Sequence, residues 1–295
     1  MTMVRVVAHG GLGVHRRGGA PTRTTLRRAL RLGVDTVEVD VCATADGAVV
    51  LHHDARTPLG TPMSDVALRQ LRRFDPEVLT LDEAMEELAS IRVVLDLKTP
   101  QTVAPLTSWL HDNVGHHDVV VCTERVDALR AIVRDAPRTR IWQTFPNVGE
   151  RKHERVTMVL AALLAHRGRD AVRVAGDIAG VIPQLSSGRE GAWSRLAGVP
   201  WRRLLPDLLE TVRYDLSACG IAVHHALVTP DLCIAAHALD LSVTAWTVNE
   251  TCVARRVASC GVDMITTDDV GAVRRALPAR PQLLLPPRPR LSVAY

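Results

Sequence analysis

Two short apolar segments of this chain end in charged side chains. Glu38 and Asp40 stand two residues apart at the end of TVEVDV, and Asp96 and Lys98 do the same in VVLDLK. Side chains two residues apart in a β-strand point to the same face. Carboxylates gathered on one face repel each other, and a hard divalent cation, Mg²⁺ or Ca²⁺, bound by their oxygens relieves the repulsion. Glu38, Asp40 and Asp96 are therefore predicted metal ligands. Lys98 beside them would attract an anionic substrate.

Two histidines and a tryptophan complete the set of candidate residues. His9 ends the first apolar segment, and His53 lies in the sequence LHHD shortly after Asp40. Two imidazoles beside a phosphate can act as general base and general acid, while a cation neutralises the charge on the phosphoryl oxygens. Trp246, near the end of a later apolar segment, is equally suited to core packing and to lining a substrate pocket. The pattern predicts acid–base chemistry at a phosphate group.

These residues need elements that bring them together, and the chain alternates short β-branched runs with helical patterns. Eight strands are expected, at 4–8, 36–41, 92–97, 119–122, 140–144, 221–223, 241–248 and 264–267. Strands that alternate with helices form a parallel sheet, and eight such units fit a (β/α)8 TIM barrel, whose strand C-terminal ends form the active-site mouth. A doubly wound open sheet is the competing architecture, but no GxGxxG follows the first strand.

Two segments interrupt this regularity. Residues 145–219, between the fifth and sixth strands, are predicted to form a long helical insertion, either an elaborated crossover or a lid over the mouth. The segment 278–295 is proline-rich and is expected to lack regular structure. It could pack on the barrel or on a neighbouring subunit, so a homo-oligomer is possible. The domain prediction is one barrel over 1–277 followed by this tail.

Composition excludes several classes of protein. The 295 residues are 47% hydrophobic and 23% charged, which is typical of a globular protein, and no apolar run reaches the length of a membrane span. With no signal-peptide pattern before the first strand, a cytoplasmic location is expected. Six scattered cysteines do not suggest a zinc site or a disulfide framework. A net charge of +4 and only 3% aromatic residues give no support for nucleic-acid binding. The expected partner is therefore a small molecule.

The motifs together resemble one enzyme family. VVAHGG, GVDTVEVDVCATADGAVVLHHD, LTLDEAMEEL, VVLDLK, VTAWTVNE and GVDMITTD are similar to the glycerophosphodiester phosphodiesterases. The resemblance covers nearly the whole chain apart from 145–219 and the tail. It implies a barrel of the phosphatidylinositol-phospholipase-C-like type and a divalent cation. It also implies acid–base catalysis by His9 and His53, with a phosphate at Lys98 and a pocket lined by Trp246.

The chain also departs from the family pattern. Gly10 stands where the family usually has an arginine, and the family's Pro-Glu-Asn-Thr is replaced by residues 21–24, PTRT. Arg16, Arg17 or Arg23 could reach into the space of the missing arginine. Asp96 stands where most members have glutamate. Asp96-Leu97-Lys98, together with the missing arginine and glutamate, resembles the related branch of sphingomyelinase D and phospholipase D toxins.

The leading prediction is a metal-dependent phosphodiesterase that yields glycerol 3-phosphate and an alcohol. The alternatives are a lysophospholipase D or sphingomyelinase D-like lyase that releases a cyclic phosphate, and a biosynthetic enzyme for another phosphate ester. A non-catalytic barrel that binds a phospho-ligand is the alternative of a different class.

Overall fold

The structure is a computed structural model of the 295-residue chain. It describes residues 3–13, 20–113, 115–145, 202 and 205–278. Most of the predicted 145–219 insertion and almost all of the 278–295 tail lie outside the described residues.

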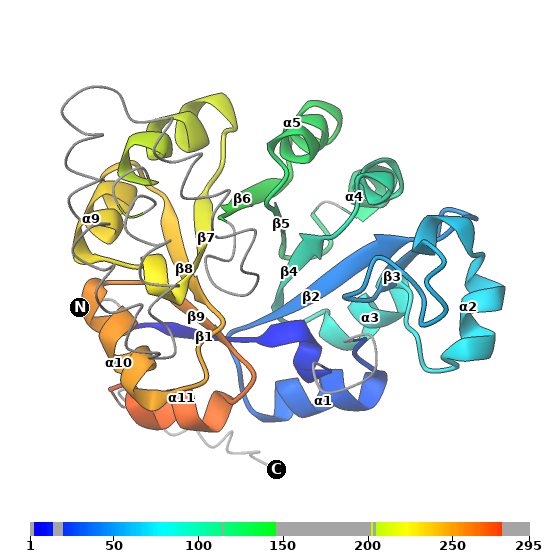
Figure 1. The fold of residues 1–295 in the computed structure, drawn as a ribbon, viewed down its shortest axis with the longest axis horizontal. Coiled ribbons are helices and arrows are strands. Elements are labelled where there is room, and N and C mark those ends of the chain that lie inside the picture. Colours follow the sequence, from blue (N-terminus) through cyan, green and yellow to red (C-terminus); the bar gives the residue numbers. More distant parts are fainter. Residues whose placement is uncertain (1–2, 14–19, 114, 146–201, 203–204, 279–295) are drawn as a thin grey trace, which may run out of the picture.

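Eight parallel strands close into a barrel (Figure 1). β1 pairs with β2 on one side and with β9 on the other, so the eight parallel strands form a closed ring, and the open-sheet alternative is wrong. The barrel strands are β1 Arg5–Ala8, β2 Thr36–Ala43, β4 Arg92–Leu97, β5 Val119–Thr123, β6 Arg140–Thr144, β7 Gly220–His224, β8 Ser242–Trp246 and β9 Met264–Thr267. A short strand, β3 Val49–Leu51, pairs antiparallel with the end of β2. The predicted (β/α)8 barrel is confirmed.

Helices surround the barrel in Figure 1. They are α1 Arg23–Arg31, α2 Leu68–Phe74, α3 Leu81–Leu88, α4 Val103–Asn113, α5 Val126–Asp135, α9 Pro230–Ala238, α10 Thr251–Cys260 and α11 Val270–Ala276. Threonine side chains cap several of their N-termini. At α3, for example, Thr80 accepts from the backbone of Glu83, and the Glu83 carboxylate accepts from the backbone of Thr80. Such reciprocal caps satisfy the free amides of the first helical turn, so these helices begin where the sequence places threonine.

Alternation along the strands separates two apolar layers. Val37, Val39 and Val41 of β2 belong to the large core between the strands and the helices. The side chains between them, Glu38 and Asp40, therefore face the barrel interior. A smaller buried cluster fills that interior: Val7, Val94, Val120, Cys122, Trp142 and Met264. The charged residues of β2 and β4 thus lie above an apolar floor at the C-terminal ends of the strands.

Some predicted boundaries hold and others are wrong. β1 ends at Ala8 as predicted, and His9 begins a 3₁₀ turn, His9–Leu12, in which Gly10 and Gly11 have left-handed φ values of 50° and 53°. β8 stops at Trp246 instead of reaching residue 248. Sequence patterns also missed α2, whose first amide, on Leu68, donates to the Asp46 carboxylate at 3.0 Å. That cap comes from 22 residues away, and the N-cap residue itself is Ala67, whose side chain cannot cap the helix.

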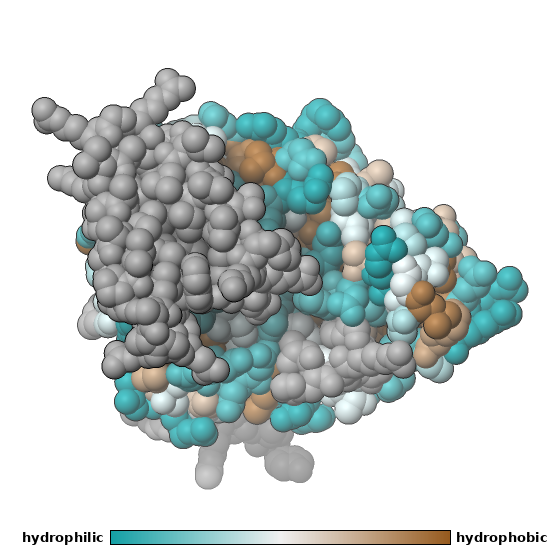
Figure 2. Space-filling view, in the orientation of Figure 1, coloured by the Kyte–Doolittle hydropathy of each residue, from teal (hydrophilic) through white to brown (hydrophobic). Residues whose placement is uncertain are grey.

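The described part of the surface in view shows no single large apolar area. In Figure 2 the described part of this face is mainly hydrophilic, with small separated hydrophobic areas. No helix within the described ranges combines the length and hydropathy that crossing a bilayer requires.

Candidate active site

One cavity at the barrel mouth collects six of the seven predicted site residues. Its volume is about 580 Å³, and its lining includes His9, Glu38, His53, Asp96, Lys98 and Trp246. The seventh, Asp40, has a side chain that is only 4% exposed and contacts Lys98. Strand ends far apart in the sequence therefore meet at one place, as the barrel predicts.

Three carboxylates form a compact cluster at the base of this cavity. Oxygens of Glu38, Asp40 and Asp96 lie within 4.8 Å of one another. The ammonium of Lys98 lies 2.6 Å from Asp40 Oδ1 and 2.6 Å from Asp96 Oδ2. Asp40 Oδ1 is buried and accepts no well-aligned hydrogen bond in spite of this close approach. Three convergent carboxylates with one poorly satisfied buried oxygen fit a hard divalent cation.

Burial and mutual repulsion raise the pKa of two carboxyl groups in this cluster. Burial raises the pKa of Glu38 to about 8, and the negative charge of Asp40 adds to the effect. Burial also raises the pKa of Asp96, against the pull of Lys98. Burial alone would lower the pKa of Lys98, but the charges of Asp96 and Asp40 outweigh it and raise that pKa, so the lysine stays positive. In the protein without a cation, Lys98 is the counter-charge of the cluster.

The turn after β1 joins His9 to the acidic cluster. The amide of Gly10 donates to Glu38 Oε2 at 2.8 Å. Gly11 packs against α1, where a Cβ would lie 2.6 Å from Leu26 Cδ2. Left-handed backbone and lack of space both require glycine at position 11. An arginine at position 10, as in the family pattern, would need a left-handed backbone φ, which residues other than glycine rarely adopt.

His9 is held by a chain of hydrogen bonds that the sequence analysis did not predict. Its Nδ1 donates to Asp268 Oδ1 at 2.6 Å. Asn249 Nδ2 donates to Asp268 Oδ2 at 2.7 Å, and Asn249 Oδ1 accepts from the Asp268 amide at 2.9 Å. Burial lowers the pKa of His9, but the bond to Asp268 and the charges of Glu38, Asp268 and Asp40 raise it to about 9.

His53 has its own carboxylate partner. Its Nδ1 donates to Asp54 Oδ1 at 3.0 Å, and both side chains are more than half exposed. The neighbouring His52 is instead buried, with Nδ1 bonded to the Asp54 carbonyl, and burial lowers its pKa. Each histidine at the cavity therefore uses Nδ1 for a carboxylate, which leaves Nε2 for proton transfer.

Two expectations about other residues have different outcomes. Trp246 lines the cavity, and its ring packs edge-on against His224, with centroids 5.5 Å apart. Arg23 does not replace the missing arginine, because its guanidinium pairs with Glu86 and Glu87 of α3. Arg16 and Arg17 lie outside the described residues. Asp268 and Asn249 were not singled out from the sequence. Both lie in the motifs GVDMITTD and VTAWTVNE quoted above, but no sequence pattern indicated their function.

A closed barrel with carboxylates, lysine and histidines at its mouth defines a class of enzymes that act on phosphate esters. The family model described as "Glycerophosphoryl diester phosphodiesterase family" matches residues 17–173, more than half of the chain. A Mycobacterium tuberculosis protein named "Probable glycerophosphodiester phosphodiesterase 2" is 25% identical, over 94% of this chain and 95% of its own.

Solved structures share the fold. An Oleispira antarctica phosphodiesterase in complex with the product sn-glycerol-3-phosphate is 15% identical, with a TM-score of 0.62 over 93% of this chain and 96% of that one. A Parabacteroides distasonis glycerophosphodiester phosphodiesterase is 18% identical, with a TM-score of 0.61 over 93% and 96% of the two chains. The chain belongs to the glycerophosphoryl diester phosphodiesterase family and, with it, to the phosphoric diester hydrolases.

Proposed function

We propose that this protein hydrolyses glycerophosphodiesters to glycerol 3-phosphate and an alcohol, with a divalent cation at Glu38, Asp40 and Asp96. The observation that carries the proposal is the cavity that joins two carboxylate-bound histidines to the acidic cluster and Lys98. The Oleispira relative, whose structure contains glycerol 3-phosphate, supports the choice of product. Mg²⁺ and Ca²⁺ both suit three carboxylates.

The histidines carry the proton transfers in this proposal. One imidazole takes a proton from a water molecule as the water oxygen attacks phosphorus. The other imidazole gives a proton to the alcohol oxygen as the P–O bond breaks. Asp268 and Asp54 orient the two rings through Nδ1. A cation bound by the carboxylates would neutralise the charge that develops on the phosphoryl oxygens. Lys98 would contribute positive charge to the same oxygens, because a cation held by Asp40 and Asp96 would compete with its ammonium for these carboxylates.

Product analysis tests the proposal. Glycerophosphocholine is incubated with the protein and Mg²⁺ or Ca²⁺, and the phosphorus products are followed by ³¹P NMR. Glycerol 3-phosphate is the expected product, and it should not form in the presence of a chelator. A cyclic phosphate, from this substrate or from lysophosphatidylcholine, would assign the protein to the cyclising lyases instead. If neither substrate is turned over with either cation, the proposed substrate class is wrong.

A further inference from the structure

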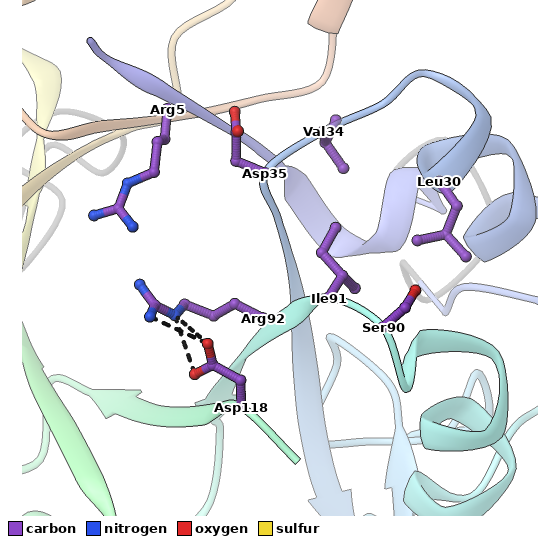
Figure 3. A pocket seen from close by; sticks show the side chains of 8 residues that line it. All are labelled: Arg5, Leu30, Val34, Asp35, Ser90, Ile91, Arg92 and Asp118. Carbon is purple, nitrogen blue, oxygen red and sulfur yellow. Dashed lines mark hydrogen bonds and ion pairs between the residues drawn. The ribbon is translucent and has the colours of Figure 1, made fainter. Parts of the chain in front are cut away.

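A second charged cavity lies at the opposite end of the barrel (Figure 3). Arg5, Arg92 and Arg140 are the first residues of β1, β4 and β6, and Asp118 directly precedes β5. In each case the residue two positions further on belongs to the apolar cluster inside the barrel. Strand alternation therefore directs these four charged side chains towards the barrel axis, beneath the apolar floor of the active site.

The pairing of these charges is unequal. Asp118 is shared by two arginines: Arg92 Nε lies 3.2 and 3.1 Å from its two oxygens, and Arg140 Nη2 bonds to Oδ1 as well. For Arg5, no hydrogen bond or ion pair links the guanidinium to another described residue. Figure 3 shows the guanidinium groups of Arg5 and Arg92 facing the same space. Asp35, the second carboxylate of the cavity, accepts a hydrogen bond from the Val6 amide at 3.0 Å.

Arg92 and Arg140 share Asp118, and Arg5 adds a third guanidinium, so three positive charges face the two carboxylates Asp118 and Asp35 and positive charge is in excess. Burial lowers the pKa of Arg140, and the positive charge of Arg92 lowers it further, which is the expected effect of that excess. The cavity has a volume of about 530 Å³, with Ser90 and the apolar side chains of Leu30 and Ile91 in its lining. Guanidinium groups bind phosphate through paired hydrogen bonds, and an anion between two of them would remove their repulsion.

We propose that this basal cavity binds a phosphate dianion between Arg5 and Arg92, either as free phosphate or as the phosphate group of a small phosphomonoester. The apolar layer of Val7, Val94 and Trp142 separates it from the active site. Binding there is therefore an additional property of the protein and does not depend on the proposed reaction.

Isothermal titration with inorganic phosphate at fixed ionic strength tests the site in the full-length protein. Arg5→Gln removes one guanidinium without leaving a carboxylate unpaired. We expect it to remove one class of phosphate sites, or to weaken that class at least about tenfold, with unchanged turnover of the phosphodiester. Arg69→Gln, which removes an exposed arginine of α2, is the matched control and should bind phosphate as the wild type does.

Arg5→Lys gives a second readout that does not require a neutral side chain at the base of the barrel. It keeps the charge but loses the paired hydrogen bonds, so its affinity should lie between those of the wild type and Arg5→Gln. A phosphate isotherm that is identical in the wild type, Arg5→Gln and Arg5→Lys overturns the proposal. So does an equal response to chloride at the same ionic strength.

The source of the phosphate is resolved by a parallel titration with glycerol 2-phosphate. Tighter Arg5-dependent binding of this phosphomonoester than of inorganic phosphate would show that the organic group contacts the cavity walls. Arg5-dependent binding of inorganic phosphate alone would identify free phosphate as the ligand. Binding of neither anion in an Arg5-dependent manner would contradict the proposal.

Discussion

Binding of a divalent cation to the acidic cluster is expected to release a proton at neutral pH. Burial and the charge of Asp40 raise the pKa of Glu38 to about 8 in the protein without a cation. With that value, Glu38 is mostly protonated at pH 7 and more so at pH 6. Only the carboxylate binds a cation, so the Glu38 proton must leave on binding.

The affinity for the cation should therefore rise with pH. From the same pKa, we expect about a tenfold gain from pH 6 to pH 7 and about a fivefold gain from pH 7 to pH 8, with little further gain from Glu38 above pH 9. The sign follows from linkage: a carboxyl group whose pKa is raised by folding favours the protonated form, and alkaline pH removes that competitor. Lys98 does not add to this dependence of cation affinity on pH, because its ammonium remains charged throughout this pH range.

Calorimetric titration with Mg²⁺ or Ca²⁺ in two buffers of different ionisation enthalpy measures the protons released. We expect the release of about one proton per cation at pH 7. Asp231→Asn, which removes an exposed carboxylate on α9, is the control and should leave the value unchanged. An affinity that is the same at pH 6 and pH 8, with no proton released at pH 7, would refute the assignment of Glu38 as a buried, protonated ligand.

Three further predictions concern the histidines and their supports. Asp268→Asn should lower kcat by about 10²-fold or more with a smaller effect on KM, and should move the His9 limb of the kcat/KM profile to lower pH, because the partner that raises the His9 pKa is lost. His9→Ala and His53→Ala should each lower turnover by about 10² to 10⁴-fold with an unchanged circular dichroism spectrum, and wild-type rates in either variant would remove the acid–base assignment. Gly11→Ala should lower both the thermal midpoint and turnover, because the added methyl meets Leu26 at 2.6 Å in a left-handed turn, and full activity with an unchanged midpoint would show that the turn does not position His9.

Most of the barrel could be predicted from the sequence because its signals are local. β-branched runs, threonine caps and alternating periodicity each act within a few residues, and the eight predicted strands correspond to the eight barrel strands. The helix α2 escaped prediction because its cap, Asp46, comes from a distant loop. The end of β8 was predicted two residues too late, at 248 instead of Trp246.

In the candidate site, too, local spacing could be predicted and long-range contacts could not. Spacing alone placed Glu38 with Asp40 and Asp96 with Lys98 on shared faces, since strand geometry relates positions i and i+2. It could not show that Lys98 lies between Asp40 and Asp96, nor that burial holds a proton on Glu38. Both depend on how closely neighbouring strands approach and on the exclusion of water.

The sequence by itself determined which side chains could do chemistry, on which strand each lies and which way it points. Only the tertiary structure decided their partners: Asp268 for His9 across 259 residues, and Arg92 and Arg140 for Asp118 at the other end of the barrel. The physical reason is that strand alternation is set by backbone geometry within a few residues. Hydrogen bonds and pKa shifts are set by distances between groups that the closed barrel brings together.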